Sequence, residues 1–400
     1  MSSSGTAVVT VTSSANELAT AYNSQQKLAT APDGSLFVVY TMELDNGSYV
    51  VQVSRSTDGG ESWTALPSDP SVVNSSRASI AVDAKGVVHL VWAEGIPSYT
   101  KSKTFTTQIY YSTFDGVSWS PKVKLSESRW YSGFPSIAID SQGRINVVWY
   151  GYDGVFYQIF YTFYNGTAWS KPLNISNLSE DSVNPAILAG DNGRLYAVWY
   201  AQVSRYFQVW YSEYNGTWSF PKALTSDPRD DLNPSAIIGP SGQLSVVWDS
   251  AVSGVVQVFH IAFNGIAWSP VGQLTHLNSS SSPPTQAFAA NGSQYVFWAS
   301  QGGIYGCVYT KTCAPFVVYS EGTNSYPYAS TGGSSSSGLN LVWTSLAGGR
   351  TSVLFESLPI STPSGTNLGA FETLAVVAVV TAIYIAYFIR RRGASASGKG

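Results

Sequence analysis

The sequence is poor in charged residues, which make up only 11% of its 400 residues. Lys and Glu favour exposed helices, so their scarcity argues against long surface helices. No basic stripe occurs before residue 390, which argues against nucleic acid as a partner. Three scattered histidines give no zinc-like spacing, and two cysteines are too few for a disulfide framework. Cys307 and Cys313 form either one local bridge across a hairpin or two free thiols.

Aromatic residues are plentiful at 14%, and Ser, Gly, Asn, Tyr and Val are abundant. β-Branched and aromatic residues favour strands, while Gly and Asn favour turns. The composition therefore predicts an all-β chain with many turns. The length is sufficient for one large domain with its own core.

One long apolar run lies near the C-terminus, at residues 370–389, after a linker at residues 359–369. About 20 apolar residues are close to the minimum that spans a bilayer core. Three arginines follow at once, so the positive-inside rule places the basic tail, residues 390–400, in the cytoplasm. We expect a single-pass cell-membrane protein with one C-terminal transmembrane helix and its larger part outside. A helix buried in the core is the alternative.

One sequence feature argues against this membrane orientation, and another argues for it. The N-terminal sequence MSSSGTAVVTVTSS has neither the basic nor the apolar region of an export signal. A cytosolic, tail-anchored protein is therefore the rival hypothesis. Eight N-x-S/T sequons favour export and a glycoprotein. They begin at Asn46, Asn74, Asn165, Asn174, Asn177, Asn215, Asn278 and Asn291.

The strongest pattern is a repeated strand that ends in an aromatic residue. It recurs seven times, as VVY, LVW, VVW, AVW, VVW, VFW and LVW, at steps of about 50 residues. The aromatic residues are Tyr40, Trp92, Trp149, Trp199, Trp248, Trp298 and Trp343. Each copy contains about four predicted strands, and Asp-Gly or Asn-Gly pairs join the third to the fourth, as tight hairpins require.

Four antiparallel strands repeated seven times predict a seven-bladed β-propeller over residues 25–358. One blade cannot bury both of its apolar faces alone, and packing blade on blade does so. The seventh copy is one strand short. Residues 6–13, within the N-terminal segment 1–24, alternate like a strand. We expect them to supply the outer strand of the last blade and close the ring.

One turn matches the Asp-box pattern S-x-D-x-G-x-x-W, and a degenerate copy follows in the second repeat. The residues of the two copies are Ser56, Asp58, Gly60, Trp63, Asp115 and Trp119. Over residues 25–345 the chain thus resembles the sialidase and Asp-box (BNR) superfamily of β-propellers. The resemblance implies that the box is structural. Its Asp would tie the turn between the third and fourth strands, and its Trp would pack between blades.

For an active sialidase the same resemblance implies an Arg triad that binds the substrate carboxylate, a Tyr–Glu nucleophile pair and an Asp acid/base. The sequence departs from that set, because Lys27 stands in the segment where the family has its first triad Arg. No Tyr–Glu pair can be assigned, and sialidases have six blades. Arg77, Arg129 and Arg229 could still form a triad. A sialidase-like exo-glycosidase is therefore the alternative, and no catalytic residue is assigned.

The loops that lead into each blade, and those between second and third strands, vary most and share one face of a propeller. Aromatic rings beside Arg and Asp suit sugars, because a ring covers the apolar face of a pyranose and polar groups meet its hydroxyls. The ligand-binding candidates are Arg77, Arg129, Trp130, Tyr131, Tyr152, Asp181, Arg205, Tyr206, Arg229, Asp230 and Asp231. For each of them, a solvated rim with incidental ion pairs is the alternative.

Together these patterns predict a membrane-anchored, non-catalytic surface propeller that binds a glycan or another surface protein. A structural component of a surface assembly is a third hypothesis. No cofactor and no metal are predicted. Calcium stays open at the adjacent Asp230 and Asp231, although the sequence has no EF-hand spacing.

Overall fold

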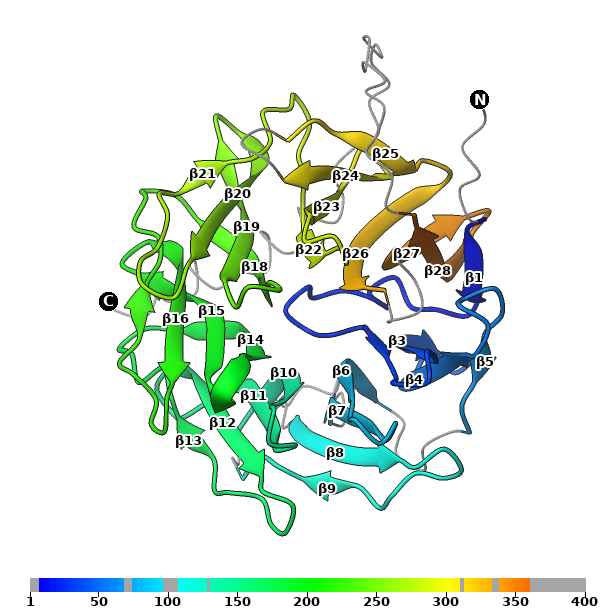
Figure 1. The fold of residues 1–400 in the computed structure, drawn as a ribbon, viewed down its shortest axis with the longest axis horizontal. Coiled ribbons are helices and arrows are strands. Elements are labelled where there is room, and N and C mark those ends of the chain that lie inside the picture. The colour runs from blue at the N-terminus through cyan, green and yellow to red at the C-terminus, as the bar shows by residue number, and fades with distance from the viewer. Residues whose placement is uncertain are drawn as a thin grey trace, which may run out of the picture. The chain divides into compact units, whose positions relative to one another are not determined.

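The computed structural model describes residues 7–67, 74–95, 107–127, 130–309, 313–332 and 338–359. They form seven antiparallel sheets of four strands each, arranged radially around a centre (Figure 1). The prediction of an all-β, seven-bladed propeller is confirmed. Within the described part of the chain, no helix has the length and apolar character needed to cross a membrane. The predicted span at residues 370–389 and the tail at residues 390–400 lie outside the described residues.

The first four blades follow one another along the chain, each numbered from its innermost strand outwards. Blade 1 contains β2 (Leu28–Thr30), β3 (Leu36–Glu43), β4 (Tyr49–Ser56) and β5 (Thr64–Ala65). Blade 2 contains β6 (Ser75–Val82), β7 (Val88–Glu94), β8 (Gln108–Phe114) and β9 (Val123–Lys124). Blade 3 contains β10 (Ser132–Ile139), β11 (Ile145–Tyr152), β12 (Tyr157–Tyr164) and β13 (Leu173–Asn174). Blade 4 contains β14 (Ser182–Ala189), β15 (Leu195–Val203), β16 (Tyr206–Tyr214) and β17 (Lys222–Ala223), with a 3-10 turn η1 (Asp191–Gly193).

The last three blades complete the ring. Blade 5 contains β18 (Asp231–Ile238), β19 (Leu244–Val252), β20 (Val255–Phe263) and β21 (Gly272–Gln273). Blade 6 contains β22 (Pro284–Phe288), β23 (Gln294–Ser300), β24 (Gly303–Tyr309) and β25 (Phe316–Tyr319). Blade 7 contains β26 (Thr323–Thr331), β27 (Leu339–Ala347), β28 (Arg350–Leu358) and β1 (Val9–Thr12). In blade 6, Cys307 and Cys313 form a disulfide with their Cα atoms 5.4 Å apart.

The repeated aromatic residues form the core between blades. The six tryptophans are each at most 1% exposed, and Tyr40 is 3% exposed. Each such ring buries on the order of 200 Å² when it packs between two sheets. Trp149 stacks on Phe160 of the next strand, with ring centroids 6.1 Å apart. The same layer therefore recurs around the whole ring.

The ring closes between blades 7 and 1. Strand β1 pairs antiparallel with β28, at the place where the sequence analysis puts residues 6–13. The Asp-box turn lies beside this closure. The Asp58 carboxylate accepts the Ser62 amide at 3.0 Å, and the Trp63 ring packs edge-on against Phe355 of β28, 5.1 Å away. A Cβ on Gly60 would overlap that Phe355 ring, so glycine is required there.

The centre of the ring is filled by residues 16–27, which connect β1 to β2 and cross the middle of the propeller (Figure 1). We call residues 16–27 the hub segment. It is irregular in structure, yet Thr20, Gln25 and Lys27 are at most 2% exposed. The cavity left beside it has a volume of about 20 Å³, room for a single water.

Candidate functional site

Five innermost strands share a β-bulge near their start. The register of β6, β10, β14, β18 and β26 against the second strand of each blade shifts there. Each bulge holds a non-glycine residue with φ between +50° and +55°, a conformation that costs free energy and often occurs at functional sites. These residues are Arg77, Phe134, Asn184, Asn233 and Tyr326. In blade 1 the hub segment supplies a comparable residue, Tyr22, with φ +72°.

The second strand of each blade brings further side chains to the same end of the ring. These are the residues that directly follow the repeated aromatics, among them Tyr150, Tyr200 and Asp249. Asn184 donates to the Tyr200 hydroxyl at 2.9 Å, and Asn233 donates to Asp249 Oδ2 at 3.0 Å. We call the combined group the central cluster. Its members are Tyr22, Arg77, Phe134, Tyr150, Asn184, Tyr200, Asn233, Asp249 and Tyr326.

Arg77 provides the positive charge of the central cluster. Its guanidinium lies 4.6 Å from the ring centroid of Phe134 and 5.9 Å from that of Tyr22. Burial opposes its charge, but the hydroxyls of Tyr131 and Tyr22 raise the pKa of Arg77 above its usual value, so it stays charged. Its buried Nε has no hydrogen-bond partner, and no carboxylate of the described residues forms an ion pair with it.

Asp249 provides the acidic group on the other side of the central cluster. It is 3% exposed and accepts hydrogen bonds from Asn233 and from the hydroxyl of Ser282. Burial raises the pKa of Asp249, and the nearby Asp231 adds to the rise. The two hydrogen bonds lower the pKa, and the net value is about 7. Burial also raises the pKa of Tyr200, and the Asp249 charge adds to that effect. Asp249 therefore changes its charge near neutral pH.

Four of the sequence-predicted residues adjoin the central cluster. Arg77 belongs to it, and the Tyr131 ring packs at a tilt against that of Tyr150, with ring centroids 5.5 Å apart. Tyr152 and Trp130 extend the aromatic surface outwards, with ring centroids 6.0 Å apart. Trp130 is 42% exposed, so the aromatic surface runs from buried to open within blade 3.

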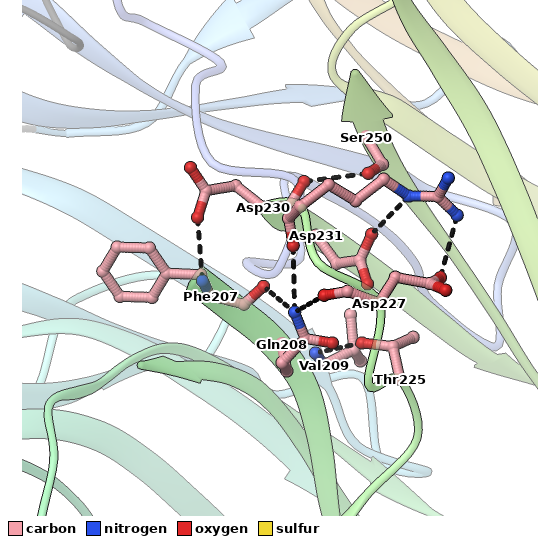
Figure 2. A network of polar contacts seen from close by, with 9 residues as sticks. Phe207, Gln208, Val209, Thr225, Asp227, Asp230, Asp231 and Ser250 are labelled. Atoms are coloured by element: carbon pink, nitrogen blue, oxygen red, sulfur yellow. Dashed lines mark hydrogen bonds and ion pairs between the residues drawn. The ribbon is translucent and has the colours of Figure 1, made fainter. Parts of the chain in front are cut away.

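Two carboxylates that were predicted to bind a ligand accept hydrogen bonds from backbone amides instead. Asp181 accepts the amide of Tyr157 at 2.9 Å, and Asp230 accepts the amide of Phe207 at 2.8 Å (Figure 2). Each residue precedes the first strand of its blade and caps the third strand of the blade before it. These positions vary in sequence, but their carboxylates are already engaged in linking neighbouring blades.

Arg229 and Asp231 are also engaged with their own neighbours (Figure 2). Arg229 pairs with Asp227 at 2.8 Å and lies 3.8 Å from Asp231, which is fully buried. Its guanidinium covers the Phe259 ring, 4.5 Å away. Arg229 is thus neutralised by two carboxylates, unlike Arg77.

The remaining candidates are Arg205, Tyr206 and Arg129. Arg205 and Tyr206 lie at the turn between β15 and β16, where the guanidinium stands 6.0 Å from the Tyr206 ring. Arg129 lies outside the described residues. The described residues therefore leave the triad of Arg77, Arg129 and Arg229 as a prediction. They also contain no group of three His, Cys, Asp or Glu that could hold a metal ion.

Sequence reasoning missed every member of the central cluster except Arg77, although the repeat carried a signal. A proline follows the bulge residue in several blades, in the pairs Phe134-Pro135, Asn184-Pro185, Asn233-Pro234 and Tyr326-Pro327. Proline inside a strand marks a bulge, because it has no amide to donate to the ladder. The residue before it would have been the one to examine.

No family model matches the chain. A xyloglucanase from Paenibacillus sp is 30% identical over 90 residues, which are 22% of this chain and 8% of that enzyme. A PL25 ulvan lyase superposes with a TM-score of 0.62 at 10% identity, over 88% of this chain and 96% of its own. An α-L-arabinanase from Penicillium chrysogenum gives 0.53 at 14% identity, over 89% and 98%. These similarities concern the fold alone, and they agree with the β-propeller that the sequence resemblance implied.

Proposed function

We propose that the chain is a cell-surface propeller that binds an anionic glycan at the central cluster, without catalysis. The observation that carries the proposal is Arg77, which is half-buried among aromatic rings, has a buried Nε without a hydrogen-bond partner and has no carboxylate partner in the described part of the chain. Buried charges in proteins are normally paired, so this guanidinium is available to a ligand carboxylate or sulfate.

The aromatic residues around Arg77 support a sugar as the carrier of that anion. Tyr22, Tyr131 and Tyr150 offer ring faces and hydroxyls within one continuous set of contacts. A pyranose presents an apolar face to such rings and hydroxyls to their polar ends. The solved propellers with this fold include a polysaccharide lyase and an arabinanase, in keeping with a glycan ligand.

Surface display is a proposal from sequence. The apolar run at residues 370–389 and the three arginines behind it support a single membrane span with the propeller outside. Eight sequons support the same orientation. Sequon occupancy and protease protection of the tail in intact cells would test it.

The binding experiment uses the purified full chain on an array of oligogalacturonates, chondroitin sulfate oligosaccharides and neutral oligosaccharides. We expect acidic sugars to bind and neutral ones to fail. Arg77→Ala should weaken binding roughly 10- to 100-fold, since a charged hydrogen bond contributes about 1.5–3 kcal/mol. The matched control is Arg194→Ala, which removes an arginine paired with Glu213 at the opposite end of blade 4. Equal losses in both variants would contradict the proposal.

A glycan-degrading enzyme is the second candidate, and Asp249 favours it. A carboxyl with a pKa of about 7 suits general acid–base chemistry near neutral pH. Glycosidases use two carboxyl groups, and the second one near Asp249 is Asp231, which is fully buried. Turnover of a fluorogenic sialoside or of any array oligosaccharide, if lost in Asp249→Asn, would replace the binding proposal by this one.

A further inference from the structure

The hub segment is a buried connection, which is unusual for irregular chain. Connections normally lie on the surface, because buried backbone needs hydrogen-bond partners that loops rarely provide. Here the partners come from the innermost strands, whose inner edges face the centre and have no further strand to pair with.

Two side-chain amides of the hub segment each connect two neighbouring blades. Gln25 Nε2 donates to the carbonyl of Arg77 at 2.6 Å and to that of Pro135 at 2.9 Å. Asn23 Nδ2 donates to the carbonyl of Asn233 at 2.7 Å and to that of Pro284 at 2.5 Å. A primary amide has two N–H donors, and both are used in each case. The two amides thus link blade 2 to blade 3, and blade 5 to blade 6.

Three of these four carbonyls, those of Arg77, Pro135 and Asn233, belong to the bulges of the central cluster. Arg77 and Asn233 are themselves the positive-φ residues, and Pro135 follows another. Thr20 binds a third positive-φ residue, donating its hydroxyl to the carbonyl of Tyr326 at 2.8 Å. A left-handed conformation at a non-glycine residue costs about 1–3 kcal/mol and persists only where its surroundings hold it. The hub segment provides that hold at Arg77, Asn233 and Tyr326.

We propose that Thr20, Asn23 and Gln25 are positioning residues of the glycan site. They bind the backbone of the residues that would contact the ligand and so fix the direction of those side chains. The same bonds fix Tyr22, which lies between Thr20 and Asn23 on the hub segment and packs 4.4 Å from Phe134. The proposal rests on the glycan-binding function and goes beyond it, because it assigns the support of three of the five bulge residues to a segment outside the blades.

Gln25→Met in the full chain removes both N–H donors at nearly constant volume. The matched control is Gln52→Met, since Gln52 Nε2 also donates to two carbonyls, those of Val53 and Leu66, far from the centre. The probe is an oligogalacturonate hexamer, with inorganic sulfate in parallel. We expect Gln25→Met to weaken hexamer binding about tenfold and Gln52→Met to leave it unchanged, at comparable losses of stability. Amide exchange should rise at residues 75–80 and 132–138 in Gln25→Met alone.

A double-mutant cycle separates positioning from general destabilisation. If Gln25 acts through Arg77, the double variant Gln25→Met/Arg77→Ala should bind no worse than Arg77→Ala alone. Additive losses would overturn the positioning role, as would full hexamer affinity in Gln25→Met. A wild-type chain that binds neither the hexamer nor sulfate would overturn the glycan function itself. Wild-type binding that Gln25→Met retains would overturn only the inference about the hub segment.

Discussion

The repeated aromatic residues and the residues that directly follow them are neighbours in the chain with opposite behaviour. Six of the seven aromatics are tryptophans buried to at most 1% exposure. The following position is less uniform, with four residue types in the seven blades. It holds Thr41, Ala93, Tyr150, Tyr200, Asp249, Ala299 and Thr344. Adjacent residues in a strand point in opposite directions, so one position carries the packing of the scaffold and the next is free to carry chemistry.

Trp199→Ala tests the scaffold position and should have the largest effect. Removing a fully buried indole leaves a cavity between blades and should lower the free energy of unfolding by about 3–5 kcal/mol. Tyr200→Phe, one residue on, loses the hydrogen bond from Asn184 and should cost only about 1–2 kcal/mol. Urea denaturation of the two variants measures both values. A larger loss in Tyr200→Phe would contradict the division between the two positions.

Asp249→Asn tests the position after the repeated aromatic through the pH dependence of stability. Because burial raises the folded pKa of Asp249 to about 7, the folded state holds this proton more tightly than the unfolded state. The stability from this group is complete below about pH 4 and is lost as the pH rises to about 7. The variant cannot ionise, so from pH 4 to 8 its stability relative to wild type should rise by on the order of 2–4 kcal/mol.

The same change should alter ligand binding. Ionised Asp249 repels an anion, so wild-type affinity for an acidic glycan should fall as the pH rises through 7. The fall should be smaller in Asp249→Asn, where Lys27, whose pKa burial lowers to about 7, still loses its charge beside Arg77. Denaturation curves and titration calorimetry at several pH values test the two effects separately. Parallel pH profiles for the two proteins would show that Asp249 does not titrate in this range.

Gly60→Ala extends the comparison to the Asp-box, which serves packing alone. A Cβ there would overlap the Phe355 ring, and the residue has a φ of +100°. We expect a loss of roughly 1–3 kcal/mol from strain and overpacking, with glycan affinity unchanged. A calorimetric melt and the array measurement check the two halves of this prediction. Loss of glycan binding in a folded Gly60→Ala protein would connect the box to the site.

Phe220→Ser should have the smallest effect. This side chain is 90% exposed beside the turn between the third and fourth strands of blade 4. Surface substitutions of this kind change stability by no more than about 0.5 kcal/mol. Glycan affinity should also be unchanged, because the residue lies at the end of the blade opposite the central cluster. A marked loss of affinity would point to a second contact surface.

The ring was predictable from sequence because its signals are local and repeated. The VVW strands fix where each second strand ends, and Asn-Gly pairs such as Asn165-Gly166 fix the hairpins. In the structure Asn165 accepts the amides of Thr167 and Ala168, and Gly166 has a φ of +94°, as such a turn requires. Each signal needs only its own neighbours in the chain.

The central cluster was only partly predictable because its geometry is not local. Arg77 was identified as a charged residue of a variable loop. Asp181 and Asp230 were identified in the same way, but they bind backbone amides of the preceding blade. The hub segment had no periodic pattern. Gln25 and Asn23 bind carbonyl oxygens, which every residue possesses, so no sequence pattern marks their partners.

The pairing of β1 with β28 affects the order in which the chain can fold during synthesis. Ribosomes add about 5–20 residues per second, so the roughly 340 residues between these strands take about 20–70 s to make. Throughout that interval Val9–Thr12 has no partner, and the hub segment has no ring to enter. Among the described residues, the first to be synthesised are thus among the last to fold.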